Sequence, residues 1–203
     1  MINEDVLRQY HATIAALNKG DMLFQQGEIA STFYIVKFGK IKMSNYSDDG
    51  REFVQGYFTD GQSFGEPPFF SKAPYPASAI ATERSDIWKI SYDDFLRLLK
   101  NNFEIHLEVM NALCSRLVYK STMLSELAIE EAQHRLLTLL KYLAEHASIH
   151  TDEPVKIGLT RQQLADMTGL RVETVIRSIK SLEQKHQLEI DDDGKILWKK
   201  ILR

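Results

Sequence analysis

Three side chains near the C-terminus combine the chemistry and the spacing needed to contact the edges of DNA bases. Glu173, Ile176 and Arg177 lie within four positions of one another, so a helix would present them on one face. An arginine can donate two hydrogen bonds to guanine, a glutamate can accept one from cytosine, and an apolar side chain can lie against the methyl group of thymine. Because packing inside the protein does not explain an apolar residue on this polar face, we predict that these three residues read DNA bases.

A capping box predicts a shorter helix immediately before the base-reading one. Thr160 and Gln163 have the spacing at which each side chain bonds the backbone N–H of the other residue, which starts a helix. Gly169 lies four residues after Ala165, and a residue without Cβ lets two helices meet at a sharp angle. Residues 159–188 are therefore predicted to form a helix-turn-helix. The buried stripe of its second helix would consist of Val172, Val175, Ile179 and Leu182. The alternative is an ordinary amphipathic helix pair with solvated charges.

The chain after this helix predicts a β-hairpin. Residues 188–190 and 195–198 have the character of short strands, and Asp193-Gly194 between them is a favoured two-residue turn. Such a hairpin would form a wing beside the second helix. Contacts to DNA phosphates are predicted for a set of polar and basic side chains on the helix pair and the wing: Thr160, Arg161, Thr174, Lys180, Lys195, Lys199 and Lys200.

Charge separates the C-terminal part from the rest of the 203-residue chain. Residues 155–203 contain ten lysines and arginines against seven acidic residues, whereas the whole chain has a net charge of −3. This difference fits a nucleic-acid-binding module joined to an acidic one.

A single cysteine, Cys114, excludes an intramolecular disulfide and a cysteine-built zinc or iron–sulfur cluster. Without an apolar leader or eighteen consecutive apolar residues, the chain is expected to be cytoplasmic, with no membrane span.

The N-terminal half has the glycine-punctuated pattern of many short strands. Between residues 19 and 92, short apolar runs alternate with turns, which predicts an antiparallel β-barrel or β-roll with Asp49-Gly50 as one hairpin turn. Residues 3–17 before it are predicted to form an amphipathic helix, and residues 93–100 after it a short helix. The expected fold class is therefore α+β.

A sevenfold apolar repeat runs along a longer helix, predicted at about residues 103–127. The repeat consists of Phe103, Met110, Leu117 and Leu124, with Leu113 and Leu127 at the complementary position. Such a repeat predicts that the helix pairs with its copy in a second chain, which makes a homodimer. The alternative is packing against the chain's own roll.

A last helix is predicted at about residues 129–146, ahead of the helix-turn-helix. We therefore divide the chain into two domains. Residues 1–127 would form an effector or sensor domain that includes the dimer helix, and residues 128–203 a winged helix-turn-helix domain.

Three stretches taken together resemble the family of the cyclic-AMP receptor protein and the fumarate-nitrate reduction regulator. They are GEIASTFYIVKFGKIKMSNYSDDGREFVQGYFTDGQSFGE at 27–66, ISYDDF at 90–95, and TRQQLADMTGLRVETVIRSIKSLE at 160–183. The resemblance implies a homodimeric transcription regulator, in which an effector in the roll repositions the DNA-binding domains through the long helix. It also implies that the loop at 148–154 contacts RNA polymerase, so activation is expected.

The resemblance assigns roles within the helix-turn-helix as well. It implies that Glu173 and Arg177 read one G·C pair in each half-site of a pseudo-palindromic operator. Val172 stands where the cyclic-AMP branch has an arginine, and Ile176 replaces the serine usual in the fumarate-nitrate branch. The bases preferred beside the G·C pair should therefore differ from those of either branch.

The effector pocket departs further from the family's pattern. Its expected residues are Phe64, Gly65, Glu66, Tyr75 and Ala77. Cyclic-nucleotide binders of the family have an arginine where Tyr75 stands, and this arginine holds the cyclic phosphate together with amides at a helix N-terminus. Here Pro67 and Pro68 remove two amide donors, and tyrosine offers one neutral hydroxyl. We therefore expect no useful affinity for cyclic AMP, and the sequence names no other effector.

There are two alternatives to a DNA-binding regulator. One is a sensor of an effector, of haem or of redox state whose DNA contacts are secondary, and the other is an enzyme. Residues 20–92 contain no histidine and no cysteine, which disfavours the metal site of an oxygenase, and no phosphate loop or nucleophile elbow is found. All six histidines lie outside the roll and are interpreted as surface or helix-packing residues. Cys114 could sense redox, although a buried, inert thiol is the expectation. We therefore expect no enzyme activity and no cofactor.

Overall fold

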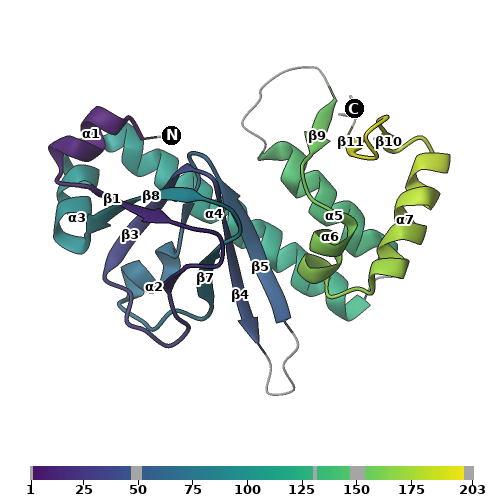
Figure 1. The fold of residues 1–203 in the computed structure, drawn as a ribbon, viewed down its shortest axis with the longest axis horizontal. Coiled ribbons are helices and arrows are strands. Elements are labelled where there is room, and N and C mark those ends of the chain that lie inside the picture. Colours follow the sequence, from purple (N-terminus) through teal and green to yellow (C-terminus); the bar gives the residue numbers. More distant parts are fainter. Residues whose placement is uncertain (1, 47–51, 130–131, 147–153, 199–203) are drawn as a thin grey trace. The chain divides into compact units, whose positions relative to one another are not determined.

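The computed structural model describes residues 2–46, 52–129, 132–146 and 154–198 (Figure 1). They belong to two compact units, residues 1–114 and 115–203, which share the long helix α4 (Phe103–Ile129). The division lies earlier in the chain than the domain boundary proposed from the sequence, after residue 127. In the second half of α4, Tyr119 stacks on Tyr142 of the C-terminal unit, with ring centroids 3.9 Å apart.

The N-terminal unit is the predicted antiparallel roll, built from two four-stranded sheets. The first sheet has the order β1-β8-β3-β6, with β1 at Thr13–Leu17, β8 at Ser85–Ser91, β3 at Thr32–Phe38 and β6 at Ser63–Phe64. The second has the order β2-β7-β4-β5, with β2 at Met22–Phe24, β7 at Ser78–Ala81, β4 at Lys40–Tyr46 and β5 at Glu52–Thr59. The predicted turn at Asp49-Gly50 lies outside the described residues, but the flanking strands β4 and β5 do pair antiparallel.

The N-terminal segment corrects the prediction of one helix over residues 3–17. Helix α1 covers only Glu4–Gln9, and His11 adopts a left-handed backbone conformation with φ of 60°. The following residues form β1, which pairs along its whole length with β8, from Thr13 opposite Lys89 to Leu17 opposite Ser85. The ladder of hydrogen bonds to a central strand therefore overrides the helical spacing of the apolar residues.

Two helices close the roll. Helix α2 (Glu66–Ser71) follows β6 directly, with Gly65 in a left-handed conformation at its start. Helix α3 (Tyr92–Asn101) confirms the short helix expected after the roll, and the hydroxyl of its N-cap Ser91 accepts a hydrogen bond from the backbone N–H of Asp94. The core between sheets and helices is aromatic, with Phe33 stacked on Phe95 at 3.7 Å between ring centroids.

The C-terminal unit is a helical cluster capped by a small sheet. Its helices are α5 (Ala132–Glu145), α6 (Arg161–Thr168) and α7 (Val172–Gln184). The sheet has the order β10-β11-β9, with β10 at Glu189–Ile190, β11 at Ile196–Trp198 and β9 at Val155–Ile157, all antiparallel. Leu136, Leu139 and Leu140 of α5 are fully buried and form the centre of this unit. Within the described ranges, no helix has the length and apolar character needed to cross a membrane.

Candidate nucleic-acid interface

The capping box predicted at the start of the helix-turn-helix is confirmed. The backbone N–H of Gln163 donates to Thr160 Oγ1 at 3.1 Å, and the backbone N–H of Thr160 donates to Gln163 Oε1 at 2.9 Å. Two backbone donors that a helix start leaves without partners are thereby satisfied. Helix α6 therefore begins at a defined residue, which fixes its position relative to the turn that follows.

The turn between α6 and α7 also forms as the sequence predicted. Gly169 ends α6 with φ of 66°, a left-handed conformation that a residue without Cβ adopts at no steric cost. The backbone N–H of Leu170 then donates to the carbonyl oxygen of Ala165 at 3.1 Å. Helix α7 starts two residues later, at Val172, so the two helices are joined by a short turn of fixed geometry.

Helix α7 segregates its side chains into a buried and an exposed face. The buried residues are Val175, Ser178, Ile179 and Leu182, whereas Val172 of the predicted stripe is only half-buried. Ser178 was missed because its hydroxyl makes it polar, although its spacing from Val175 and Leu182 places it on the same face.

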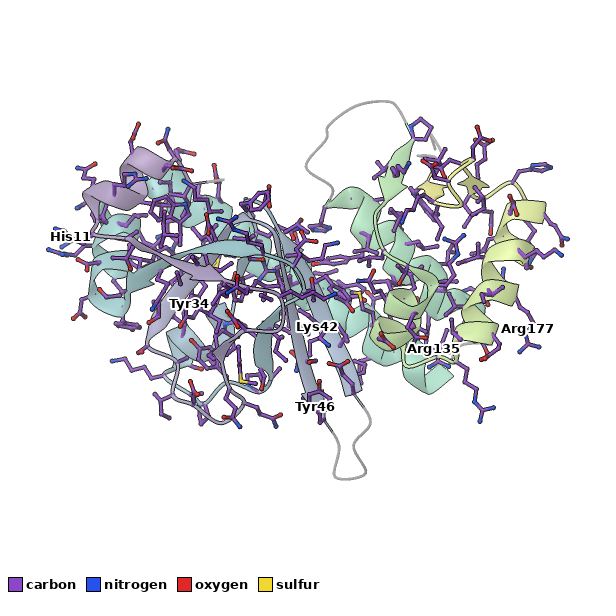
Figure 2. The ribbon with its side chains drawn as sticks, viewed as in Figure 1. His11, Tyr34, Lys42, Tyr46, Arg135 and Arg177 are labelled. Carbon is purple, nitrogen blue, oxygen red and sulfur yellow. The ribbon has the colours of Figure 1, made fainter. Side chains whose placement is uncertain are left out.

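The predicted base-reading residues all lie on the exposed face of α7. Glu173 and Arg177 are exposed, and Ile176 keeps 50% of its surface accessible between them. Figure 2 shows the Arg177 side chain on the outer side of α7. A carboxylate, a guanidinium and an apolar side chain are thus presented together, which is the set of groups that base edges in a major groove accept.

The predicted phosphate-contacting residues surround this face with different degrees of exposure. Thr160 and Lys180 are exposed, whereas Arg161, Thr174 and Lys195 are half-buried. The hydroxyl of Thr160 accepts the capping hydrogen bond, so its own O–H is left to donate to an anion. Lys199 and Lys200 lie outside the described residues.

The wing differs from the predicted two-residue turn. The backbone N–H of Asp191 donates to the carbonyl oxygen of Lys195 at 2.9 Å, and Gly194 N–H donates to the Asp191 carbonyl oxygen at 2.9 Å. Gly194 has φ of 74°, so the connection is a three-residue loop that ends on a left-handed glycine. The side chain of Asp191 explains the longer loop, because its carboxylate accepts a hydrogen bond from the Lys195 backbone N–H at 2.7 Å.

Neither strand β9 nor the role of Lys156 on it was predicted from the sequence. Lys156 Nζ lies 2.6 Å from Asp191 Oδ2 and 3.4 Å from Asp193 Oδ2. Hydrogen bonding to Lys156, followed by that to the backbone of Lys195, lowers the pKa of the Asp191 carboxyl. Asp192 and Asp193 are exposed, so the tip of the wing is acidic.

The apolar repeat on α4 is exposed, as a face that pairs with a second chain must be. Phe103, Met110, Leu117 and Leu124 retain between 47% and 70% of their surface. Of the two residues predicted at the complementary position, Leu113 is half-buried and packs against the core of the roll, and the side chain of Leu127 lies outside the described residues. Leu107 and Cys114 are exposed instead and lie four residues after Phe103 and Met110. We call the set Phe103, Leu107, Met110, Cys114, Leu117 and Leu124 the α4 face.

The residues expected to line an effector pocket are packed into the core of the roll. Phe64, Gly65, Glu66, Tyr75 and Ala77 are all buried. The ring of Tyr75 lies 3.7 Å from that of Phe24, centroid to centroid, and Tyr34 lies 5.6 Å from Phe64. Tyr75 and Phe64 are therefore each packed against another aromatic ring, and Figure 2 marks Tyr34 within the N-terminal unit.

Of the groups considered for haem or redox sensing, Cys114 and three histidines are exposed, and His106 and His146 are half-buried. Cys114 is exposed in the single chain, contrary to the buried thiol expected. His11 Nδ1 lies 3.3 Å from a carboxylate oxygen of Asp94, and His146 Nδ1 lies 2.8 Å from the carbonyl oxygen of Tyr142. His150 is outside the described residues. In the part of the chain that the structure covers, no three metal-ligating side chains gather into a site.

Comparison with known proteins finds two family models in the chain. Residues 14–102 match the model of the cyclic nucleotide-binding domain, and residues 134–201 match that of the Crp-like helix-turn-helix domain. The chain is 33% identical over 167 residues to the cAMP-activated global transcriptional regulator CRP of Haemophilus influenzae, covering 81% of this chain and 74% of that protein. It is 31% identical over 179 residues to the regulator of the same name from Pasteurella multocida, covering 87% and 85%.

Solved structures show the same fold at lower identity. FixK2 from Bradyrhizobium japonicum superposes with a TM-score of 0.74 over 93% of each chain, at 17% identity. CprK complexed with OCPA superposes with a TM-score of 0.73 over 98% of this chain and 92% of that one, at 19% identity.

A roll, a long helix and a winged helix-turn-helix define a DNA-binding transcription regulator, a class that is not enzymatic. With this order of domains and relatives above 30% identity over most of its length, the chain belongs to the CRP/FNR family of transcription regulators.

Proposed function

We propose that this protein is a homodimer that binds a pseudo-palindromic operator, with helix α7 of each protomer in the major groove. The observation that supports it most is the exposed face of α7, on which Glu173, Ile176 and Arg177 stand side by side. A dimer with two such helices reads two half-sites about one helical turn apart, roughly 10 base pairs.

Each base-reading residue has a distinct role in this proposal. Arg177 donates two hydrogen bonds to guanine, and Glu173 accepts one from the paired cytosine. Ile176 lies against a thymine methyl group, a contact for which its exposed apolar surface is suited. One G·C pair per half-site, flanked by a thymine-containing step, is therefore the expected core of the operator.

Phosphate contacts position the helix without reading sequence. We assign them to Thr160 and Arg161 at the start of α6, to Thr174 and Lys180 on α7, and to Lys195 on the wing. The acidic wing tip limits this set, because the exposed Asp192 and Asp193 repel phosphate while Lys156 is engaged by Asp191. In this proposal, the phosphate contacts that contribute to DNA affinity therefore come mainly from α6 and α7.

The protein is proposed to activate transcription through RNA polymerase. The relatives in Haemophilus influenzae and Pasteurella multocida carry the name of cAMP-activated global regulators. The loop that would contact polymerase is residues 148–154, most of which lie outside the described part of the chain. We propose that cyclic AMP is not the effector here, because Tyr75 is buried among aromatic rings at the position where an arginine would hold the phosphate.

Selection of bound DNA from a random library tests the proposal, with purified protein and no added small molecule. We expect enrichment of an inverted repeat with a conserved G·C pair in each half-site. The same selection with Arg177→Ala protein should lose the preference at that pair while keeping the spacing of the repeat. Enrichment of no sequence, in the presence or absence of cyclic AMP, would contradict the proposed function.

A further inference from the structure

Four aromatic side chains fill the interior of the roll next to α2. We call Phe24, Tyr34, Phe64 and Tyr75 the aromatic plug. Phe24 stacks on Tyr75 with centroids 3.7 Å apart and planes at 14°, and lies 5.4 Å from Tyr34. Tyr34 stacks in turn on Phe64 at 5.6 Å and 13°. No member exposes more than 7% of its surface, so all four rings are buried inside the roll.

The backbone holds Tyr75 in place from both sides. Its N–H donates to the carbonyl oxygen of Glu28 at 2.8 Å, and its carbonyl oxygen accepts from the N–H of Gly27 at 2.9 Å. Pro74 forms a β-bridge with Ile29 directly before it. This pairing of two loop segments fixes the backbone at Tyr75, and the stacking on Phe24 holds its ring.

The polar ends of the plug are satisfied internally. The Tyr75 hydroxyl donates to the carbonyl oxygen of Thr32 at 3.4 Å, and the hydroxyls of Tyr75 and Tyr34 are hydrogen-bonded to each other. Burial raises the pKa of both phenols, and the carboxylate of Glu28 raises it further. The plug thus contains no cation, and the charge that acts on its hydroxyls is negative, which disfavours an anionic ligand.

The plug also touches the turn that leads into α2. Gly65 adopts φ of 77° there, and a Cβ at this position would lie 3.2 Å from the ring of Tyr75. Phe64, directly before this glycine, is itself a member of the plug. The position of the turn is consequently set by the packed rings.

We propose that the aromatic plug is a built-in occupant of the effector site, so that the protein binds its operator without a small-molecule effector. This inference rests on the proposed function as a DNA-binding regulator. The side chain of Tyr75 does what a bound ligand would otherwise do, because it fills the roll and fixes the approach to α2.

The first arm of the test uses the wild-type protein. Its melting temperature and its operator affinity are measured with and without millimolar cyclic AMP, and separately with cyclic di-GMP. The expected result is no change in either quantity. A nucleotide that raises the melting temperature or tightens operator binding would overturn the proposal, and the melting measurement reads this out even if the protein binds no specific DNA.

The second arm removes the ring of Tyr75 and tests whether added phenol can replace it. Tyr75→Ala should lower operator affinity by about tenfold, within the usual range of coupling between two sites, and phenol added as the missing side chain should restore it. The matched control is Phe33→Ala, which removes a buried ring stacked on Phe95, outside the plug. That variant should melt earlier but keep its operator affinity below its melting temperature. Wild-type affinity in Tyr75→Ala would contradict the built-in occupant.

Discussion

Of the three residues proposed to read bases, only Arg177 can donate two hydrogen bonds to one base, so the proposal makes it the most important for base recognition. Arg177→Ala should weaken binding to the selected operator by about 1–3 kcal/mol and relax discrimination at one base pair per half-site. Titration of the operator and of a version with that pair changed measures both effects. A loss that is equal on all sequences would contradict the assigned role.

Lys180 provides the matched control on the same helix. It is exposed on α7 like Arg177 but is assigned to a phosphate. Lys180→Ala should weaken binding to all sequences alike and lower the salt dependence by about one ion. The pair of variants therefore separates base reading from electrostatic attraction.

Gly39 tests a steric requirement of the roll. Its φ is 98°, and a Cβ would collide with Ser85 Oγ and with the carbonyl oxygen of Arg84. Gly39→Ala should destabilise the roll by the left-handed penalty of about 1–2 kcal/mol plus about 1–3 kcal/mol for overpacking.

Gly20 provides a control that shows the left-handed backbone penalty alone. It has φ of 94° but no atom within 4 Å of an added Cβ. Gly20→Ala should therefore show only the backbone penalty in a urea or thermal melt. Equal losses in the two alanine variants would mean that the contact with Ser85 relaxes at no cost.

Single residues were predictable where spacing and polarity pointed the same way. Thr160, Gln163 and Gly169 follow local rules of helix starts and turns, and all three adopt the expected conformations. Ser178 was not predicted on the buried face of α7 because its hydroxyl makes it polar. Cys114 is exposed in the single chain but lies on the α4 face that the proposed dimer covers. A small hydroxyl is buried where it packs between apolar neighbours, and a thiol is exposed where the face of its helix is uncovered.

At the scale of elements, the α4 face is the surface that we propose a second copy covers. Leu117 exposes 69% of its surface on this face, and its neighbour Val118 exposes 66% beside it. Leu117→Glu should place a charge between the paired helices and give a monomer, whereas Val118→Glu should remain a dimer. Sedimentation equilibrium distinguishes the two. A dimer in both variants would place the interface elsewhere.

Cys114 reports the register of the paired helices. It occupies one layer of the α4 face, between Met110 and Leu117, so in a parallel dimer the two thiols face each other. Mild oxidation with a copper catalyst should then form a disulfide-linked dimer within the geometric limits of that bond. Cys114→Ser protein should remain uncrosslinked. Slow crosslinking that rises with protein concentration would indicate random collisions instead.

Elements were predictable where a periodic pattern was long, and not where pairing decided the structure. The sevenfold repeat predicted α4, but the complementary position changed to Leu107 and Cys114 because Leu113 packs on the roll. Residues 13–17 follow helical spacing yet form β1, since their partner β8 is distant in sequence. Strand β9 is three residues long, which is too short to reveal a period.

At the scale of the whole molecule, the chain combines a roll with a buried aromatic interior and a helix-turn-helix with an exposed polar face on α7. The roll keeps the sheets of a cyclic nucleotide-binding domain but fills its interior with the aromatic plug. The C-terminal unit keeps the helix-turn-helix and places exposed polar, basic and apolar groups on α7. The fold was predictable from motifs in family order, whereas the packing of Tyr75 against Phe24 depends on contacts between distant segments.

The most direct test of this account changes the distance between the two half-sites of the selected operator. Two copies of α7 held by the paired α4 faces require half-sites on the same side of the DNA, so insertion of about five base pairs, half a turn, should reduce affinity to the nonspecific level. Insertion of about ten base pairs controls for the change in length. Affinity that is unchanged by the half-turn insertion would contradict a homodimer that reads two half-sites with its recognition helices.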